Sequence, residues 1–529
     1  MNRPSISVPL GTSASASPRF APSSRVERLL CGLAIAIGLI GAVAFWAARG
    51  SLWEDEVIAI THGLQPLSSF VSEMLRNDIH PPTWFLLLKG WTAWAPGSDA
   101  WALASSLVLA LAAAWTVHRV TLRHDGPSAA LWACALYVVQ PTFAWSAGTL
   151  RMYSLVPLLA VLSWHLGRRL IQGGSTRVGV VLVTVQLLLA YSHAIEFLFV
   201  GLIALNVLWV DWSRSDRAGR WRWARWQALT LVGMTWLPLS ALSRGTEPLP
   251  PSHWTGLFHN PASMIAGWSL ESDSPFLIAG GLVFLGMAAL ALRTADGRRI
   301  LLGLPVLGLL AALGIGMFGK PLYKTPVFAA NLLPFLAIAA GLGAARLGAP
   351  AARAGAALLL LCLAATTLPW SQRQLPPENY APAGRAIAAA VRPGDLVVVP
   401  NVSVYWGVMR YATTPQWGRP LEILPPDNAS WQALKRKLGP DWVRCLSLTQ
   451  TGDRVEFNGV TYVIGEPRDL ALAPGGSLWV VQRARYASSV GLTTPARVTG
   501  TEWFGKELSV QRLQADPTGT TTVSNPDRP

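Results

Sequence analysis

Long apolar runs separated by short polar connections make up most of the first 370 residues. Leu29–Ala48, Ala100–Val117, Phe276–Leu292 and Ala354–Leu368 are examples. A helix needs about 20 apolar residues to cross the hydrocarbon core of a bilayer, and a soluble core helix rarely needs so many. This pattern predicts a polytopic membrane protein rather than a large soluble helical one. We expect about eleven spans, near residues 29–48, 100–118, 128–146, 152–167, 178–192, 195–210, 227–243, 275–292, 300–318, 326–345 and 354–370.

The composition agrees with this class. Only 13% of the residues are charged and 51% are hydrophobic, whereas soluble domains carry about 25% charged residues. The first apolar run is too long for the apolar core of a signal peptide and follows a segment rich in Ser, Pro and Arg. We therefore expect an uncleaved anchor helix, with residues 1–27 as a disordered cytoplasmic tail.

The net charge of +15 indicates orientation rather than a nucleic-acid partner. Arginines gather in alternate connections, and the connections between these are nearly free of Lys and Arg, which is the positive-inside pattern. It places the N-terminus in the cytoplasm and the C-terminus outside, provided that Pro82–Trp94 lies at the outer interface instead of crossing. The expected cytoplasmic arginines are Arg119, Arg123, Arg168, Arg169, Arg177, Arg214, Arg217, Arg220, Arg222, Arg225, Arg293, Arg298, Arg299, Arg346 and Arg353.

After Trp370 the composition becomes that of a soluble domain. Alternating helix and strand patterns predict a small α/β domain over residues 371–510 on the outer side, followed by a disordered polar tail, 511–529. Whether this domain binds an acceptor or is structural stays open. The expected helices are Ala381–Val391 and Trp431–Leu438, and the expected strands are Leu396–Pro400, Trp442–Leu448, Thr461–Ile464 and Ser477–Gln482.

Three consecutive carboxylates, Glu54, Asp55 and Glu56, follow the first span in the outer segment 49–99. Mutual repulsion raises the proton affinity of at least one of them. Such a group can accept a proton from a hydroxyl that attacks a substrate. A solvated acidic loop is the alternative, and charge alone favours it.

Cationic and polar side chains recur at the expected outer ends of later spans. Arg151-Met152-Tyr153 and His193 lie there, as do Lys320 and Lys324, on the side where the positive-inside rule disfavours lysine. Arginine can pair bidentately with a phosphate. The alternatives are an interfacial anchor for Arg151, a histidine that only forms hydrogen bonds for His193, and an ordinary solvated loop for Lys320 and Lys324.

Several of these motifs resemble those of a known family. They are Leu52-Trp53-x-Asp55-Glu56, Asp78-x-His80-Pro81-Pro82, Arg151-Met152-Tyr153, the Ser192-His193 turn and Pro393-Gly394-Asp395. In this order, within a polytopic chain, they resemble the GT-C glycosyltransferases of the protein mannosyltransferase type and their bacterial aminoarabinose transferase-like relatives. The resemblance covers about residues 28–411.

The resemblance implies an all-α GT-C transmembrane domain over residues 28–370 with a small extracytoplasmic α/β domain, in a multi-pass protein of a bacterial inner (plasma) membrane. It implies an inverting transferase that moves a sugar from a polyprenyl phosphate to a lipid, glycan or protein acceptor on the outer face. Asp55 would be the general base, and Glu56 would support it or help to bind a divalent cation, a requirement that the sequence leaves undecided. Asp78 and His80 would lie near the site. The donor phosphate would be held by Arg151, Tyr153, His193, Lys320 and Lys324.

The chain departs from the family pattern at two places. Gly148-Thr149-Leu150 stands where relatives often have Gln-Glu before the Arg-x-Tyr element. Pro326-Val327-Phe328 stands where many carry an Arg-Tyr pair, which leaves Lys324 as the substitute cation.

Three other classes of protein are alternatives to a transferase. A transporter or flippase places ionisable groups near the bilayer midplane, and the predicted spans here are almost free of them. A non-catalytic envelope-assembly protein would not need Asp55. A lipid-linked polymer ligase or polymerase would rely on a different, larger outer loop.

Overall fold

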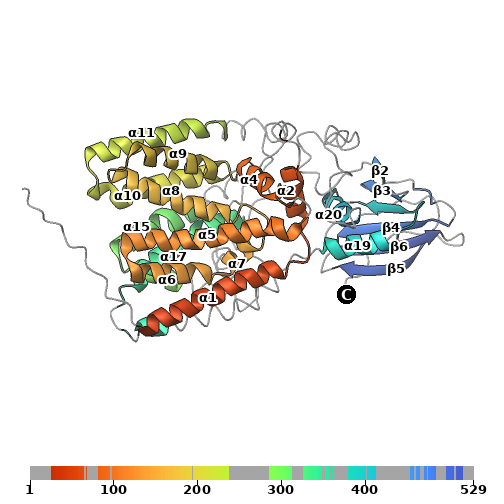
Figure 1. Ribbon diagram of the computed structural model, residues 1–529, viewed down its shortest axis with the longest axis horizontal. Coiled ribbons are helices and arrows are strands. Elements are labelled where there is room, and N and C mark those ends of the chain that lie inside the picture. The colour runs from red at the N-terminus through yellow and green to blue at the C-terminus, as the bar shows by residue number, and fades with distance from the viewer. Residues whose placement is uncertain are drawn as a thin grey trace, which may run out of the picture.

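The computed structural model describes residues 25–64, 67, 81–95, 98–193, 195–237, 285–311, 326–347, 350, 352–357, 360, 379–400, 402–412, 453–457, 460–464, 470–472, 475–483, 496–504 and 508–515. Helices make up the N-terminal part and a mixed sheet the C-terminal part (Figure 1). The helices are α1 Arg25–Ala47, α2 Glu54–Leu64, α4 Thr83–Thr92, α5 Asp99–Asp125, α6 Pro127–Val138, α7 Pro141–Ala147, α8 Leu155–Ile171, α9 Thr176–Ala190, α10 Glu196–Asp211, α11 Arg217–Met234, α15 Ala295–Leu301, α17 Pro326–Ala344, α19 Tyr380–Ala390 and α20 Val402–Ala412.

The chain is an integral membrane protein. Among the described helices, Arg25–Ala47, Asp99–Asp125 and Glu196–Arg214 are long and apolar enough to cross a membrane, and Pro127–Val138, Thr176–Ala190 and Ala330–Ala344 are shorter apolar helices. Exposed apolar side chains on α5, among them Val108, Leu111 and Trp115, form the kind of surface that a bilayer covers.

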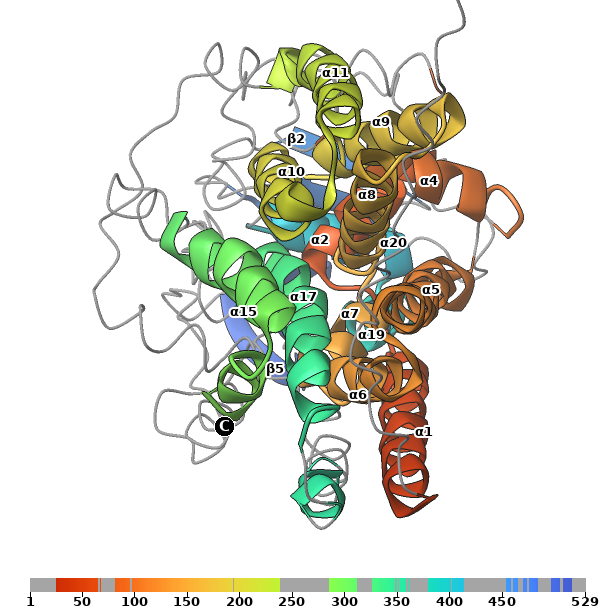
Figure 2. The ribbon, with the colours of Figure 1, turned by 90° about the vertical axis from the view of Figure 1, so that its left-hand side faces the viewer.

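The helices run side by side, with α17 in the middle of the bundle (Figure 2). It packs against α6, α8 and α15. Side chains all around α17, such as Phe335, Ile338 and Leu342, are buried, as expected for a helix that is apolar on every face. Gly343 permits a close approach, because a Cβ there would lie 1.6 Å from the carbonyl oxygen of Leu290.

Two predictions about the helices were wrong. The span expected at 128–146 is two helices, because Pro141 lacks an N–H group and restricts Gln140 to an extended conformation (φ −68°, ψ 132°). Several arginines expected in connections lie in helices. Arg119 and Arg123 belong to α5, and Arg168 and Arg169 belong to α8. Arg217–Arg225 forms the first half of α11, which Asp216 caps by accepting a hydrogen bond from the Gly219 N–H (2.6 Å). The expected spans 227–243, 275–292, 300–318 and 354–370 lie partly outside the described residues.

The two ends of the bundle differ in what they carry (Figure 1). The end nearest the C-terminal sheet holds α2, α4, the turn between α7 and α8 and the turn between α9 and α10. The opposite end holds the helix ends and connections that are rich in arginine. There Arg168 donates to Asp211 (2.8 Å) and Arg214 donates to Asp296 (2.8 Å). The acidic segment and the Arg151 turn therefore share one end of the bundle.

The C-terminal part is a six-stranded sheet in the order β2-β3-β1-β4-β6-β5. Strand β1 is parallel to β3 and β4, and the other pairs are antiparallel. Asp395, before β1, fixes the strand start, because it accepts hydrogen bonds from the Ser477 N–H (2.9 Å) and Trp479 Nε1 (3.1 Å). The strands are β1 Leu396–Val399, β2 Asp453–Phe457, β3 Val460–Ile464, β4 Ser477–Arg483, β5 Ala496–Phe504 and β6 Leu508–Ala515.

Most of the helices and strands predicted for this domain that can be compared with the structure are present. The helix expected at Ala381–Val391 and the strands expected at Leu396–Pro400, Thr461–Ile464 and Ser477–Gln482 are confirmed as α19, β1, β3 and β4. The tail boundary after residue 510 was wrong, because β6 continues to Ala515 and buries Gln511 and Leu513. The elements expected at Trp431–Leu438 and Trp442–Leu448, the segment 1–24 and residues 516–529 lie outside the described part of the chain.

Candidate active site

The acidic segment is the first turn of α2 and not a solvated loop. The N–H groups of Glu56 and Val57 bond to the carbonyl oxygen of Trp53 at 3.0 Å each. Carboxylates in a first helical turn interact favourably with the helix dipole. The two described carboxylates differ in access, since the Asp55 side chain is 34% exposed and that of Glu56 is fully buried.

Glu56 joins three segments of the bundle. Its carboxylate pairs with the Arg49 guanidinium and accepts hydrogen bonds from the Trp53 N–H (3.0 Å) and the Leu150 N–H (2.7 Å). Burial raises the pKa of Glu56, and Arg49 and the two backbone N–H groups act in the opposite direction. Both oxygens accept hydrogen bonds, so the side chain is placed to fix the start of α2 against the turn after α7.

Asp55 faces Arg151. Oδ2 of Asp55 lies 3.4 Å from Nη1 of Arg151, and the same nitrogen donates to the Asp55 carbonyl oxygen at 3.3 Å. Only 8% of Arg151 is exposed. Its Nε is buried and has no hydrogen-bond acceptor among the residues that the structure describes. A buried guanidinium N–H without an acceptor favours the binding of an anion.

Aromatic rings support this guanidinium. The centroid of the Tyr153 ring lies 6.0 Å from Cζ of Arg151. Tyr153 stacks on Trp145 with a centroid distance of 4.9 Å. Gly148 leaves room for this turn, because a Cβ there would lie 2.2 Å from Cδ1 of Phe45.

His193 lies in the turn between α9 and α10. Burial and the nearby Arg151 lower the pKa of His193 to about 3. The imidazole is therefore neutral near pH 7. Its Nδ1 accepts from the Ile195 N–H (3.4 Å), which leaves the proton on Nε2. His193 therefore contributes no positive charge to this end of the bundle.

The structure brings Asp55, Glu56, Arg151, Tyr153 and His193 to one end of the bundle. Asp78, His80, Lys320 and Lys324 lie outside the described residues. Within the described part of the chain, no group of three or more His, Cys, Asp and Glu side chains could hold a metal ion.

Sequence reasoning missed a second set of polar residues, which joins the bundle to the C-terminal domain. Asp99, at the start of α5, pairs with Arg410 of α20 and accepts a hydrogen bond from the Tyr411 hydroxyl (2.5 Å). That hydroxyl accepts a hydrogen bond from the Leu52 N–H (2.9 Å), and Ser51 Oγ donates to Asn379 Oδ1 (3.1 Å). No motif in the sequence signals pairs so far apart.

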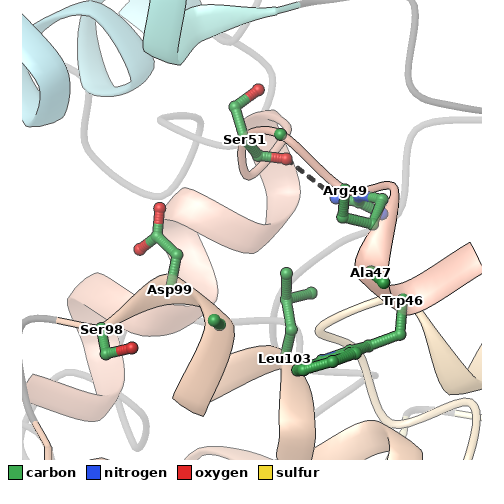
Figure 3. A pocket seen from close by; sticks show the side chains of 9 residues that line it. Trp46, Ala47, Arg49, Ser51, Ser98, Asp99 and Leu103 are labelled. Atoms are coloured by element: carbon green, nitrogen blue, oxygen red, sulfur yellow. Dashed lines mark hydrogen bonds between the residues drawn. The ribbon is translucent and has the colours of Figure 1, made fainter. Parts of the chain in front are cut away.

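A cavity of about 460 Å³ borders this junction (Figure 3). Trp46 and Leu103 line its apolar side, and Arg49, Ser51 and Asp99 contribute polar groups. Arg49 donates to the Ser51 carbonyl oxygen (3.3 Å). The cavity therefore lies directly beside the residues that precede Asp55.

No protein-family model and no curated protein sequence matches the chain. Solved structures do match. ArnT from Cupriavidus metallidurans in the apo state gives a TM-score of 0.53 at 11% identity, covering 91% of this chain and 98% of that one. ArnT from the same organism bound to undecaprenyl phosphate gives a TM-score of 0.50 at 12% identity, covering 91% and 97%. The chain therefore has the fold seen in ArnT.

Proposed function

We propose that this protein is an inverting glycosyltransferase that takes a sugar from a polyprenyl phosphate and transfers it to an envelope acceptor on the outer face of the membrane. The observation that carries the proposal is the pairing of a partly exposed carboxylate, Asp55, with the buried guanidinium of Arg151. Fold likeness to ArnT, which has been solved with undecaprenyl phosphate, supports the donor class.

The proposed reaction uses these two groups on opposite sides of the sugar. Asp55 accepts the proton of an acceptor hydroxyl while its oxygen forms a bond to the anomeric carbon. The bond from that carbon to the phosphate oxygen breaks, and the electron pair leaves with the polyprenyl phosphate. Arg151 stabilises the negative charge that develops on this leaving group. Attack from the face opposite the phosphate inverts the configuration.

The ion pair between Asp55 and Arg151 must open in this reaction. A 3.4 Å separation leaves no room for a sugar ring between the two groups. We propose that the donor phosphate replaces Asp55 as the partner of Arg151, with Arg151 Nε–H as a further donor. Asp55 is then available to the acceptor. Donor binding and activation of the base are thereby linked.

A divalent cation has no evident place at Glu56. Its buried carboxylate is already paired with the Arg49 guanidinium and accepts hydrogen bonds from Trp53 and Leu150, and that guanidinium would repel a cation bound beside it. Asp55 is the described carboxylate at this site with an accessible oxygen.

The proposed orientation places this end of the bundle outside the cytoplasm. The arginine-rich connections lie at the other end, as the positive-inside rule requires of the cytoplasmic side. A sugar already attached to a lipid can reach such a site laterally through the bilayer. Nucleotide sugars, which are cytoplasmic, would not reach it.

Reconstituted protein tests the donor class. Purified protein in liposomes is mixed with polyprenyl-phosphate sugars and an envelope extract as the acceptor source, and released polyprenyl phosphate is followed by mass spectrometry. We expect release that depends on the protein and on the acceptor. Donor lipids that stay intact with every sugar and acceptor tried, while the protein remains folded, would argue against a transferase.

A further inference from the structure

The C-terminal domain contacts the carboxylate segment directly. Tyr411, in the last turn of α20, donates to Oδ2 of Asp99 (2.5 Å) and accepts from the Leu52 N–H (2.9 Å). Leu52 is fully buried, and Tyr411 and Asp99 are 4% and 6% exposed. A hydroxyl with both a buried donor and a buried acceptor has one favourable orientation, so this bridge fixes the position of the Leu52 backbone.

Charge compensation strengthens the same junction. The buried carboxylate of Asp99 pairs with the buried guanidinium of Arg410, which α20 supplies together with Tyr411. Burial and the nearby Asp99 raise the pKa of Tyr411, so its hydroxyl keeps its proton and remains the donor to Asp99. Removing either charged partner would leave the other buried without compensation. The domain is thus tied to the bundle by an interaction that requires one relative placement.

The junction lies three residues before Asp55. Ser51 and Leu52 are held by Asn379 and Tyr411, on the side of the C-terminal domain. Glu56 is held by Arg49 and by the Leu150 N–H, on the side of the bundle. Asp55 lies between these two attachments and is itself partly exposed. Its position therefore depends on both.

We infer that Tyr411 and Arg410 are positioning residues, through which the C-terminal domain holds the Asp55 segment in the geometry that the reaction needs. This inference rests on the proposed transferase function. It gives the C-terminal domain a role in the chemical step that does not require it to touch the substrate. Since a misplacement of about 1 Å can cost about 100-fold in rate, loosening this junction should lower kcat strongly.

The test uses the full-length protein and three variants of the junction: Tyr411→Phe, Asp99→Asn and the two combined. Trp479→Phe is the control, because it removes one hydrogen bond inside the C-terminal sheet, to Asp395, and leaves the junction intact. Two quantities are measured. The first is kcat and KM for a polyprenyl-phosphate sugar, and the second is hydrogen–deuterium exchange of the peptide covering residues 50–57.

We expect Tyr411→Phe to lower kcat about 10- to 100-fold, with the donor KM changed less than about threefold, and to speed exchange at Leu52. Asp99→Asn should lower kcat and speed exchange as well, and the double variant should lose less than the two single effects combined, because the two residues share one hydrogen bond. Trp479→Phe should keep the wild-type kcat and the wild-type exchange of residues 50–57.

The two measurements separate the inference from the function on which it rests. If the wild-type protein turns over no donor but Tyr411→Phe speeds exchange of residues 50–57, the proposed function fails and the attachment stands. If the wild type is active and Tyr411→Phe matches it in kcat and in exchange, the positioning role is overturned. A fall in kcat that Trp479→Phe reproduces would also overturn it, because general stability would then be the cause.

Discussion

Nη1 of Arg151 lies 3.4 Å from Oδ2 of Asp55 and 3.3 Å from the carbonyl oxygen of the same residue. Arg151, which we propose binds the donor phosphate, thus contacts Asp55, which we propose activates the acceptor. The contact links the two roles, and changing each residue alone tests them separately.

Arg151→Lys should weaken donor use. A lysine retains the charge but offers no planar pair of N–H groups for a phosphate, and hydrogen bonds to charged groups contribute about 1.5–3 kcal/mol each. We expect kcat/KM for the donor to fall about 10- to 100-fold, mainly through KM. Steady-state kinetics measures this. Arg177→Lys, at an exposed arginine on α9, is the matched control and should behave as wild type; an unchanged donor KM in Arg151→Lys would remove Arg151 from the phosphate site.

Glu56→Gln should destabilise the protein. The change leaves the buried Arg49 guanidinium without its carboxylate, and breaking a buried pair costs about 3–5 kcal/mol. Thermal unfolding in detergent measures the loss. Combining it with Arg49→Gln should cost less than the sum of the two single changes. Glu502→Gln, at an exposed position of β5, should have little effect, and an equal effect of the two Glu→Gln changes would contradict the structural role of Glu56.

The environment of His193 makes a pH prediction. The pKa of this histidine is lowered to about 3, below the value of about 6.5 in an unfolded chain. Between these two values the unfolded state binds the additional proton, so stability rises with pH across this window and falls as pH drops below about 6.5. Relative to His193→Gln, the wild type should lose about 1–2 kcal/mol of unfolding free energy when the pH is lowered from 7.5 to 5.

Unfolding measured at several pH values tests this directly. The same low pKa means that the pH profile of kcat/KM should show no limb from His193 between pH 5 and pH 8. A limb near pH 6.5 that disappears in His193→Gln would show that the imidazole is charged in the folded protein and would contradict the account.

Gly148→Ala should disturb the turn that carries Arg151. A Cβ at Gly148 would lie 2.2 Å from Cδ1 of Phe45, and overpacking of this kind costs about 1–3 kcal/mol. We expect a lower thermal midpoint and reduced activity. Gly201→Ala in α10, where a Cβ meets nothing within 4 Å, is the control and should keep or raise the midpoint. Equal midpoints for the two variants would show that Phe45 yields without cost.

The membrane class and much of the helix order were predictable because apolar runs of this length have few other uses. Local motifs also pointed to Asp55, Arg151 and His193, which lie together in the fold. The break at Pro141 could have been predicted, since proline disfavours helix at the residue before it. The surrounding apolar residues, however, have the pattern of one continuous span.

Other features depend on contacts between distant segments. Asp99 meets Arg410 across more than 300 residues, and neither residue stands in a motif. The difference in burial between Asp55 and Glu56 likewise follows from where Arg49 and Leu150 lie in three dimensions. Adjacent carboxylates look equivalent in a sequence, and only packing separates a buried structural group from an accessible one.

The role of Asp55 as the base is tested by the kinetics of Asp55→Asn. The control is Asp216→Asn, which makes the same change at the cap of α11, at the opposite end of the bundle. Loss of the base should lower kcat for donor consumption by at least about 100-fold. The donor KM should stay unchanged or fall, because the phosphate no longer competes with Asp55 for Arg151. Asp216→Asn should keep wild-type kinetics. Donor consumption by Asp55→Asn at the wild-type rate would contradict the assignment of Asp55 as the base.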